Sequence, residues 1–197
     1  MPQSKLYKFL HPVVTFVLRL AYRPQISGLS NVPADGSFIV CANHSSNLDA
    51  FLMMCFIGKQ HQIHVLAKKE LFDSKLLGPI MRGTQMVCVD RSKMDINSVR
   101  LSLNYLKNGE KIGIFPEGTR VSEGESADAK SGIVRLADKT RVPVIPMYIP
   151  SVKPLFRKTP LIFGEPFYIN PERARLTPED FPPLAEGVMS RIKALAP

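Results

Sequence analysis

Two short stretches of this sequence carry residue types that could act on a substrate together. The first, "NHSSNLD", places His44 five positions before Asp49. Neighbours on a helix surface are three or four positions apart, so this spacing does not suit two partners on one helix face. A turn that contains His44, followed by a helix that begins near Asp49, would instead fold the carboxylate back onto the imidazole. The intervening serines and asparagine are good helix N-caps.

Such a pair has a definite chemistry. A carboxylate held against one imidazole nitrogen fixes the tautomer of the histidine and leaves the other nitrogen to accept a proton. The sequence around Ser126 is not a G-x-S-x-G elbow, and no cysteine neighbours the pair, so no protein nucleophile accompanies it. A His–Asp pair without a nucleophile suits activation of a substrate hydroxyl or a water. Taken alone, the pattern also fits a capping aspartate and an ordinary surface histidine.

The second stretch, "FPEGTR", follows an apolar run and has the groups that bind phosphate. It offers backbone N–H groups, a hydroxyl and a guanidinium, which come from Gly118, Thr119 and Arg120. Glu117 could orient that guanidinium or a substrate hydroxyl. Arg91, at the end of another expected strand, could add a second guanidinium. Two arginines beside a tight turn favour a small anionic group, although a turn with an exposed arginine also fits.

The elements that must position these groups follow from the hydrophobic patterning. Short apolar runs rich in β-branched residues predict strands at 37–42, 63–67, 86–90, 111–115, 142–149 and 160–164. Helices are expected at 50–58, from Asp95 to about 107, at 132–139, and near the end of the chain. Because 142–149 contains two prolines, it should lie near a sheet edge or a bulge.

Strands that alternate with helices predict a single α/β domain with a mostly parallel central sheet flanked by helices. Sites in such sheets form beyond the carboxyl ends of the strands. The polar stretches "NHSSNLD", "DRSKMD" and "PEGTR" each follow an expected strand. We therefore expect them to meet at one edge of the sheet.

The first part of the chain has a different character. Residues 1–24 contain four bases and no acid, and their apolar residues recur at helical spacing. Pro12 should break this stretch into two short amphipathic helices. The apolar run is too short to span a bilayer, which needs about 20 residues. We expect a membrane-associating helical arm at 1–24, followed by a catalytic domain at 25–197, although a helical pair packed on the core fits the same pattern.

Composition narrows the class of partner. The formal net charge of +9 favours an anionic partner such as nucleic acid, a membrane or a phosphorylated substrate. Cys41, Cys55 and Cys88 form no CxxC pair, which indicates reduced thiols in a cytosolic setting. His61 and His64 have helical metal spacing but no further ligands nearby. The sequence has no nucleotide-binding glycine motif, so no cofactor is expected. It also has no acidic cluster that suggests a tightly held metal, so no metal is expected.

Taken together, these residues resemble the 1-acylglycerol-3-phosphate acyltransferase family, part of the broad glycerolipid acyltransferase group. "HSSNLD" matches its His-x4-Asp block, "GTQMVCVDR" a block that ends in arginine, "FPEGTR" the third block in full, and "VPVIPM" the proline-rich fourth. The resemblance covers roughly residues 35 to 165 in the right order. It departs from the family in the second block, where Gly83 lies farther from Arg91 than usual. The chain is also short for the family.

The resemblance implies a reaction. His44, oriented by Asp49, would remove the proton from the free hydroxyl of lysophosphatidic acid, and the alkoxide would attack an acyl thioester carried by acyl carrier protein or coenzyme A. No acyl-enzyme would form. The acceptor phosphate would be held by Arg91, Gly118, Thr119 and Arg120, with Glu117 orienting the acceptor or an arginine. The product would be phosphatidic acid.

Other functions remain open at this stage. The same site could act on another acceptor, such as glycerol-3-phosphate or a lysophospholipid, or activate water as a thioester hydrolase. A silent, basic lipid- or nucleic-acid-binding module is a third alternative. The intact His–Asp pair and the lack of Ser/Gly-rich basic tails argue against that module, so no nucleic acid partner is expected. The expected location is the cytoplasmic face of the cell membrane, as a peripheral, monotopic protein on an anionic surface.

Overall fold

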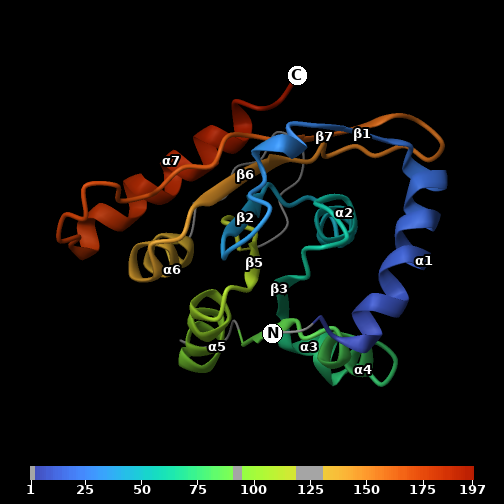
Figure 1. Cartoon of the computed structure of the whole chain (residues 1–197), viewed down its shortest axis with the longest axis horizontal. Helices are drawn as coiled ribbons and strands as arrows, with labels where there is room; N and C mark the ends of the chain where they lie inside the picture. Colours follow the sequence, from blue (N-terminus) through green and yellow to red (C-terminus); the bar gives the residue numbers. More distant parts are fainter. Residues whose placement is uncertain (1–2, 91–94, 119–130) are drawn as a thin grey trace.

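A parallel sheet organises the chain. The computed structural model describes residues 3–90, 95–118 and 131–197, and in these ranges a seven-stranded sheet has the order β1-β7-β6-β2-β5-β3-β4 (Figure 1). The strands are β1 (Pro24–Ser27), β2 (Ile39–Ala42), β3 (Ile63–Lys68), β4 (Val87–Val89), β5 (Lys111–Ile114), β6 (Val144–Tyr148) and β7 (Thr159–Phe163). Neighbouring strands are parallel except β6 and β7. The expected mostly parallel α/β domain is confirmed.

Helices cover both faces of this sheet. They are α1 (Lys5–Tyr22), α2 (Leu48–Phe56), α3 (Lys69–Asp73), α4 (Leu77–Gly83), α5 (Ile96–Lys107), α6 (Gly132–Thr140) and α7 (Phe181–Lys193), with short 3₁₀ turns η1 (Leu29–Asn31) and η2 (Pro178–Asp180). The α1, α2 and α4 helices share one apolar core with the sheet, while α5, α6 and α7 share the other. Asp95 caps α5 as expected, because its carboxylate accepts from the backbone N–H of Ser98 at 3.0 Å.

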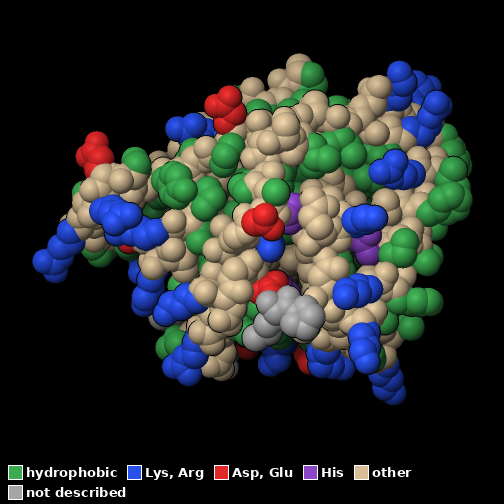
Figure 2. Space-filling view, in the orientation of Figure 1, with side chains coloured by type: hydrophobic (Ala, Val, Ile, Leu, Met, Phe, Trp, Pro, Cys, Tyr) green, Lys and Arg blue, Asp and Glu red, His purple; other side chains and the backbone are tan. Residues whose placement is uncertain are grey.

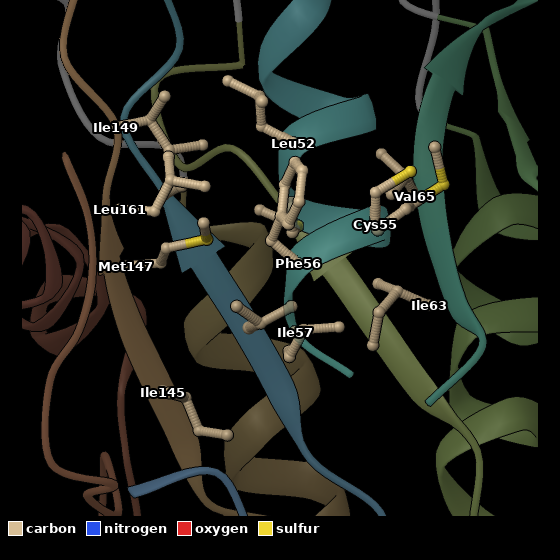
Figure 3. Close-up of a cluster of buried hydrophobic side chains, with 14 of the residues drawn as sticks. Leu52, Cys55, Phe56, Ile57, Ile63, Val65, Ile145, Met147, Ile149 and Leu161 are labelled. Atoms are coloured by element: carbon tan, nitrogen blue, oxygen red, sulfur yellow. The ribbon is translucent and has the colours of Figure 1, made fainter. Parts of the chain in front are cut away.

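The central strand β2 shows why its sequence is apolar throughout. Val40 and Ala42 belong to the core beneath α2, whereas Ile39 and Cys41 belong to the core beneath α6 and α7. A strand covered on both faces needs a continuous apolar run rather than an alternating one. Figure 3 shows the first of these cores, where the α2 side chains lie against side chains of β3 and β6.

The N-terminal arm is one helix, and the prediction that Pro12 breaks it in two is wrong. Pro12 lies inside α1, which runs unbroken for 18 residues. Proline removes one helical hydrogen bond, but contacts on either side of it hold both halves against the body. Before it, the Tyr7 hydroxyl donates to the carbonyl of His61 at 3.0 Å; after it, Leu18 is buried in the core.

The proline-containing segment forms β6 inside the sheet, between β2 and β7. The edge position is wrong, but the alternative of a bulge is confirmed. Val144 pairs with Phe167 and Met147 pairs with Phe163, so the partner segment carries one more residue between the two pairs than β6 does. Pro146 lies at this bulge, where its missing N–H coincides with the interruption of the ladder.

Within the described ranges, no helix is both long and apolar enough to cross a membrane.

Candidate active site

The turns that follow β2 and β5 meet at one edge of the sheet. These strands are parallel neighbours, with Cys41 opposite Ile114, so their carboxyl ends lie side by side. The backbone N–H of His44 donates to the carboxylate of Glu117 at 2.7 Å. The rings of His44 and Phe115 stack with their centroids 4.0 Å apart and fix the plane of the imidazole. The first and third polar stretches therefore form one site, as expected.

His44 and Asp49 form the predicted pair. The Nδ1 atom of His44 lies 3.2 Å from Oδ2 of Asp49, whose side chain is 1% exposed. A carboxylate can only accept, so the proton of this contact belongs to Nδ1. That tautomer leaves Nε2 as the ring nitrogen that can take a proton from a substrate.

The turn between them explains the spacing of five. The Asp49 carboxylate accepts from the backbone N–H groups of Ser45 and Ser46, each at 2.7 Å. Asn47 occupies the N-cap position of α2, but its side chain makes no capping hydrogen bond. Asp49 thus closes the turn and orients His44 with the same carboxylate.

The pKa values of Asp49 and Glu117 are shifted in opposite directions by their surroundings. Burial tends to raise the pKa of Asp49, but hydrogen bonds from His44 and Ser46 and the charge of Lys153 outweigh it, so the pKa lies below the ordinary value. Burial raises the pKa of Glu117, although its hydrogen bond to the His44 backbone acts the other way. Asp49 is therefore held as a carboxylate, while ionisation of Glu117 is opposed by its surroundings.

Sequence reasoning missed Lys153, which lies in the connection between β6 and β7. Its Nζ atom is 2.9 Å from Oδ1 of Asp49, and its side chain is only 4% exposed. Asn43 brings this connection to the site, because its side chain exchanges hydrogen bonds of 2.6 and 3.0 Å with the backbone of Ile149. A lone lysine so far along the chain from His44 has no local pattern that would have identified it.

An apolar pocket of about 240 Å³ opens beside His44. Its walls include Phe51 of α2, Val65 of β3 and Met81 of α4, and Lys68 contributes the charged group of its lining. The pocket lies on the α2 face of the sheet, so a hydrocarbon chain bound there would place its polar end near the imidazole.

Of the remaining predicted site residues, Gly118 is among the described residues and three others are not. Gly118 adopts φ 68° and its N–H donates to the carbonyl of Phe115 at 2.9 Å, which forms the tight turn expected of "PEGTR". Arg91, Thr119 and Arg120 lie outside the described residues. Within the described parts of the chain, no cluster of three or more His, Cys, Asp or Glu side chains could hold a metal ion.

Known proteins are similar to this chain in sequence and in fold. The family model described as "Acyltransferase" matches residues 23–150. The 1-acyl-sn-glycerol-3-phosphate acyltransferase of Bacillus subtilis (strain 168) is 33% identical over 96% of both chains. The 1-acyl-sn-glycerol-3-phosphate acyltransferase alpha of Mus musculus is 29% identical, over 84% of this chain and 61% of the mouse protein. The crystal structure of the acyltransferase PlsC from Thermotoga maritima has a TM-score of 0.71 and 27% identity, covering 97% of this chain and 78% of that one.

The mostly parallel sheet and the match to the family model thus define the class of this protein as an acyltransferase. The chain belongs to the acyltransferase family, as the resemblance implied, and similar proteins across nearly its whole length are 1-acyl-sn-glycerol-3-phosphate acyltransferases.

Proposed function

We propose that this protein transfers an acyl group from a thioester to the free hydroxyl of 1-acylglycerol-3-phosphate and forms phosphatidic acid. The observation that carries the proposal is an imidazole, held by a buried carboxylate, beside an apolar pocket that can take a lipid chain. The acceptor is supported by the names of similar proteins from Bacillus subtilis and mouse.

The reaction follows from the orientation of His44. As the acceptor hydroxyl attacks the thioester carbonyl carbon, Nε2 takes its proton. The tetrahedral intermediate collapses, the carbon–sulfur bond breaks, and the thiol leaves with the proton from the imidazolium. Asp49 stabilises that imidazolium through Nδ1. No covalent acyl-enzyme is required.

The donor is acyl carrier protein or coenzyme A carrying the acyl thioester. The acceptor phosphate is held by Gly118, Thr119 and the guanidinium groups of Arg91 and Arg120, because backbone N–H groups, a hydroxyl and arginines together suit a phosphate. Glu117, fixed on the backbone of His44, orients the acceptor. The reaction uses no cofactor or metal, and the protein has no nucleic acid partner.

We place the protein on the cytoplasmic face of the cell membrane, with residues 1–24 as the docking segment and 25–197 as the catalytic domain. The α1 helix has two apolar sides: Tyr7 and Leu18 are buried against the body, while a second side faces outward. This outward stripe consists of Phe9, Val13, Phe16, Val17 and Leu20. Figure 2 shows apolar side chains along the outer side of α1, with lysines and arginines beside them. An apolar stripe flanked by bases suits an anionic membrane surface.

One assay tests the proposed reaction. The purified protein is given an acyl thioester with and without 1-acylglycerol-3-phosphate, and both thiol release and phosphatidic acid are measured. We expect thiol release that depends on the acceptor and equals the phosphatidic acid formed. Thiol release at the same rate without acceptor would indicate a hydrolase and refute the proposal. Glycerol-3-phosphate and a lysophospholipid serve as competing acceptors.

A further inference from the structure

The side chain of Lys153 is enclosed by acceptors. Besides Oδ1 of Asp49, its Nζ atom lies 2.9 Å from the hydroxyl of Ser45, 2.6 Å from the carbonyl of Pro150 and 3.2 Å from the carbonyl of Ser151. An ammonium group has three donors, so these acceptors within the protein saturate it. Lys153 therefore has no donor left to hold a substrate, and its effect must pass through the groups that it contacts.

The connection that contains Lys153 is held by hydrogen bonds both before and after this residue. Before it, Asn43 holds Ile149 at the end of β2. After it, the backbone N–H of Phe156 donates to the carbonyl of Ala21 in α1 at 2.6 Å. The ammonium is thus delivered to Asp49 by a fixed segment, which matters because burying an unpaired charge is costly.

The charges around His44 give this ammonium a role. Among the described residues, two carboxyl groups contact the histidine: Asp49 from α2 at the ring, and Glu117 from the turn after β5 at the backbone. Cations come from three other elements: Lys153 at Asp49, Lys68 in the lining of the pocket, and Lys193, whose charge acts on Glu117. Carboxylates beside an imidazole favour its protonated form, which cannot accept the proton of a hydroxyl. A cation fixed on Asp49 opposes that protonation.

We propose that Lys153 is a positioning residue that sets the orientation and charge balance of the His44–Asp49 pair. The ammonium occupies Oδ1 of Asp49, which leaves Oδ2 for the imidazole and for the two backbone N–H groups of the turn. This inference rests on the proposed role of His44 as the base.

The test compares neutral and charged replacements. Lys153→Gln keeps a hydrogen-bond donor but removes the charge, and Lys153→Arg keeps the charge. Lys158→Gln is the matched control, since Lys158 is an exposed lysine at the end of the same connection. For each variant kcat and KM for both substrates are measured between about pH 5 and pH 9, a range that brackets histidine titration. Thermal melting checks that each variant is folded.

We expect the acid limb of the kcat profile of Lys153→Gln to move up by about one pH unit, which lowers the rate on that limb about tenfold, with little change in either KM. Lys153→Arg and the Lys158→Gln control should keep the limb of the parent. A folded Lys153→Gln protein with an unmoved acid limb would overturn the proposal. If Lys153→Gln does not fold, Lys153→Met replaces it, and unfolding of both would assign Lys153 a purely structural role and also overturn it.

The outcome is separable from the fate of the proposed function. Should His44→Ala abolish transfer while Lys153→Gln leaves the profile unchanged, the role of Lys153 fails and the base remains. Should His44→Ala leave transfer unchanged, the assignment of the base fails first, and the role of Lys153 fails with it.

Discussion

Replacing part of the outward stripe of α1 should release the protein from membranes without unfolding it. The change is Phe9→Ser, Val13→Ser and Val17→Ser together, three positions one helical turn apart on the same side. The five side chains of the stripe are between 54% and 70% exposed in the folded protein, so they contribute little to its core. Leu10, which is more enclosed, is left in place.

The expected loss of membrane-binding free energy follows from the exposed apolar area of these side chains. Full burial of a valine or phenylalanine side chain is worth about 1.5–3 kcal/mol. Side chains that keep more than half of their surface exposed would each gain about 1–2 kcal/mol from lipid. Loss of three should therefore cost about 3–6 kcal/mol and weaken vesicle binding by at least about 10²-fold. The bases of α1 add about 1 kcal/mol each, and salt screens only that part.

Co-sedimentation with vesicles that contain anionic lipid, run beside thermal melting, measures both properties. The matched control carries Ile96→Ser, Val99→Ser and Leu101→Ser, three exposed apolar positions of α5 away from the stripe. We expect the control to sediment like the parent, and high salt to release the parent only in part. The reasoning is refuted if the α1 variant stays folded and still sediments as well as the parent. An α1 variant that unfolds would show instead that the stripe belongs to the core.

Three further predictions concern the site. His44→Ala should leave the melting temperature intact and slow acyl transfer by about 10²–10⁴-fold, the usual worth of a general base; near-parental turnover of the folded variant would remove His44 from the mechanism. Arg120→Ala should lower kcat/KM for the phosphorylated acceptor by about 10- to 150-fold, with the thioester much less affected; equal losses for both substrates would make Arg120 structural. Burial raises the pKa of Glu117, so the folded chain binds the proton of this carboxyl group more tightly than the unfolded chain does. The free energy of unfolding therefore falls as the pH rises from the pKa of Glu117 in the unfolded chain to its pKa in the folded chain. Glu117→Gln should therefore raise the melting temperature by about 2–4 °C at pH 8 for each kcal/mol relieved, and the gain should vanish at about pH 4; identical melting curves at pH 8 would contradict this.

The hydrophobic pattern of the sequence predicted those helices and strands that depend only on neighbouring residues. The strand at 63–67 is apolar and bounded by polar turns, and it appears as β3 at Ile63–Lys68. The prediction failed where distant contacts decided. Pro12 is tolerated because Tyr7 and Leu18 hold both halves of α1. The strand β1 was missed because "PQIS" is short and half-buried, and its pairing with β7 comes from a segment far along the chain.

The same division applies to the site. The spacing of His44 and Asp49, with good capping residues between them, was enough to predict a turn that brings them together, since all the groups involved are local. The contact of His44 with Glu117 followed from the shared edge of parallel strands. Lys153 could not be predicted, because its position depends on contacts of its connection with Asn43 and Asp49, which lie more than 100 positions earlier in the chain.

The pairing of the edge strand β1 has a consequence for the order of folding. Pro24 pairs with Thr159, and Ala21 accepts from Phe156, so the end of α1 is fastened by segments that the ribosome makes much later. Closing so long a loop is entropically unfavourable, and sheets built from distant pairs form slowly. Throughout that interval the outward stripe of α1 can meet lipid while β7 is still being made. We therefore expect anionic vesicles to speed the refolding of the denatured chain. A helix already bound at the lipid surface restricts the position of β1, which lowers the entropy cost of pairing β1 with β7.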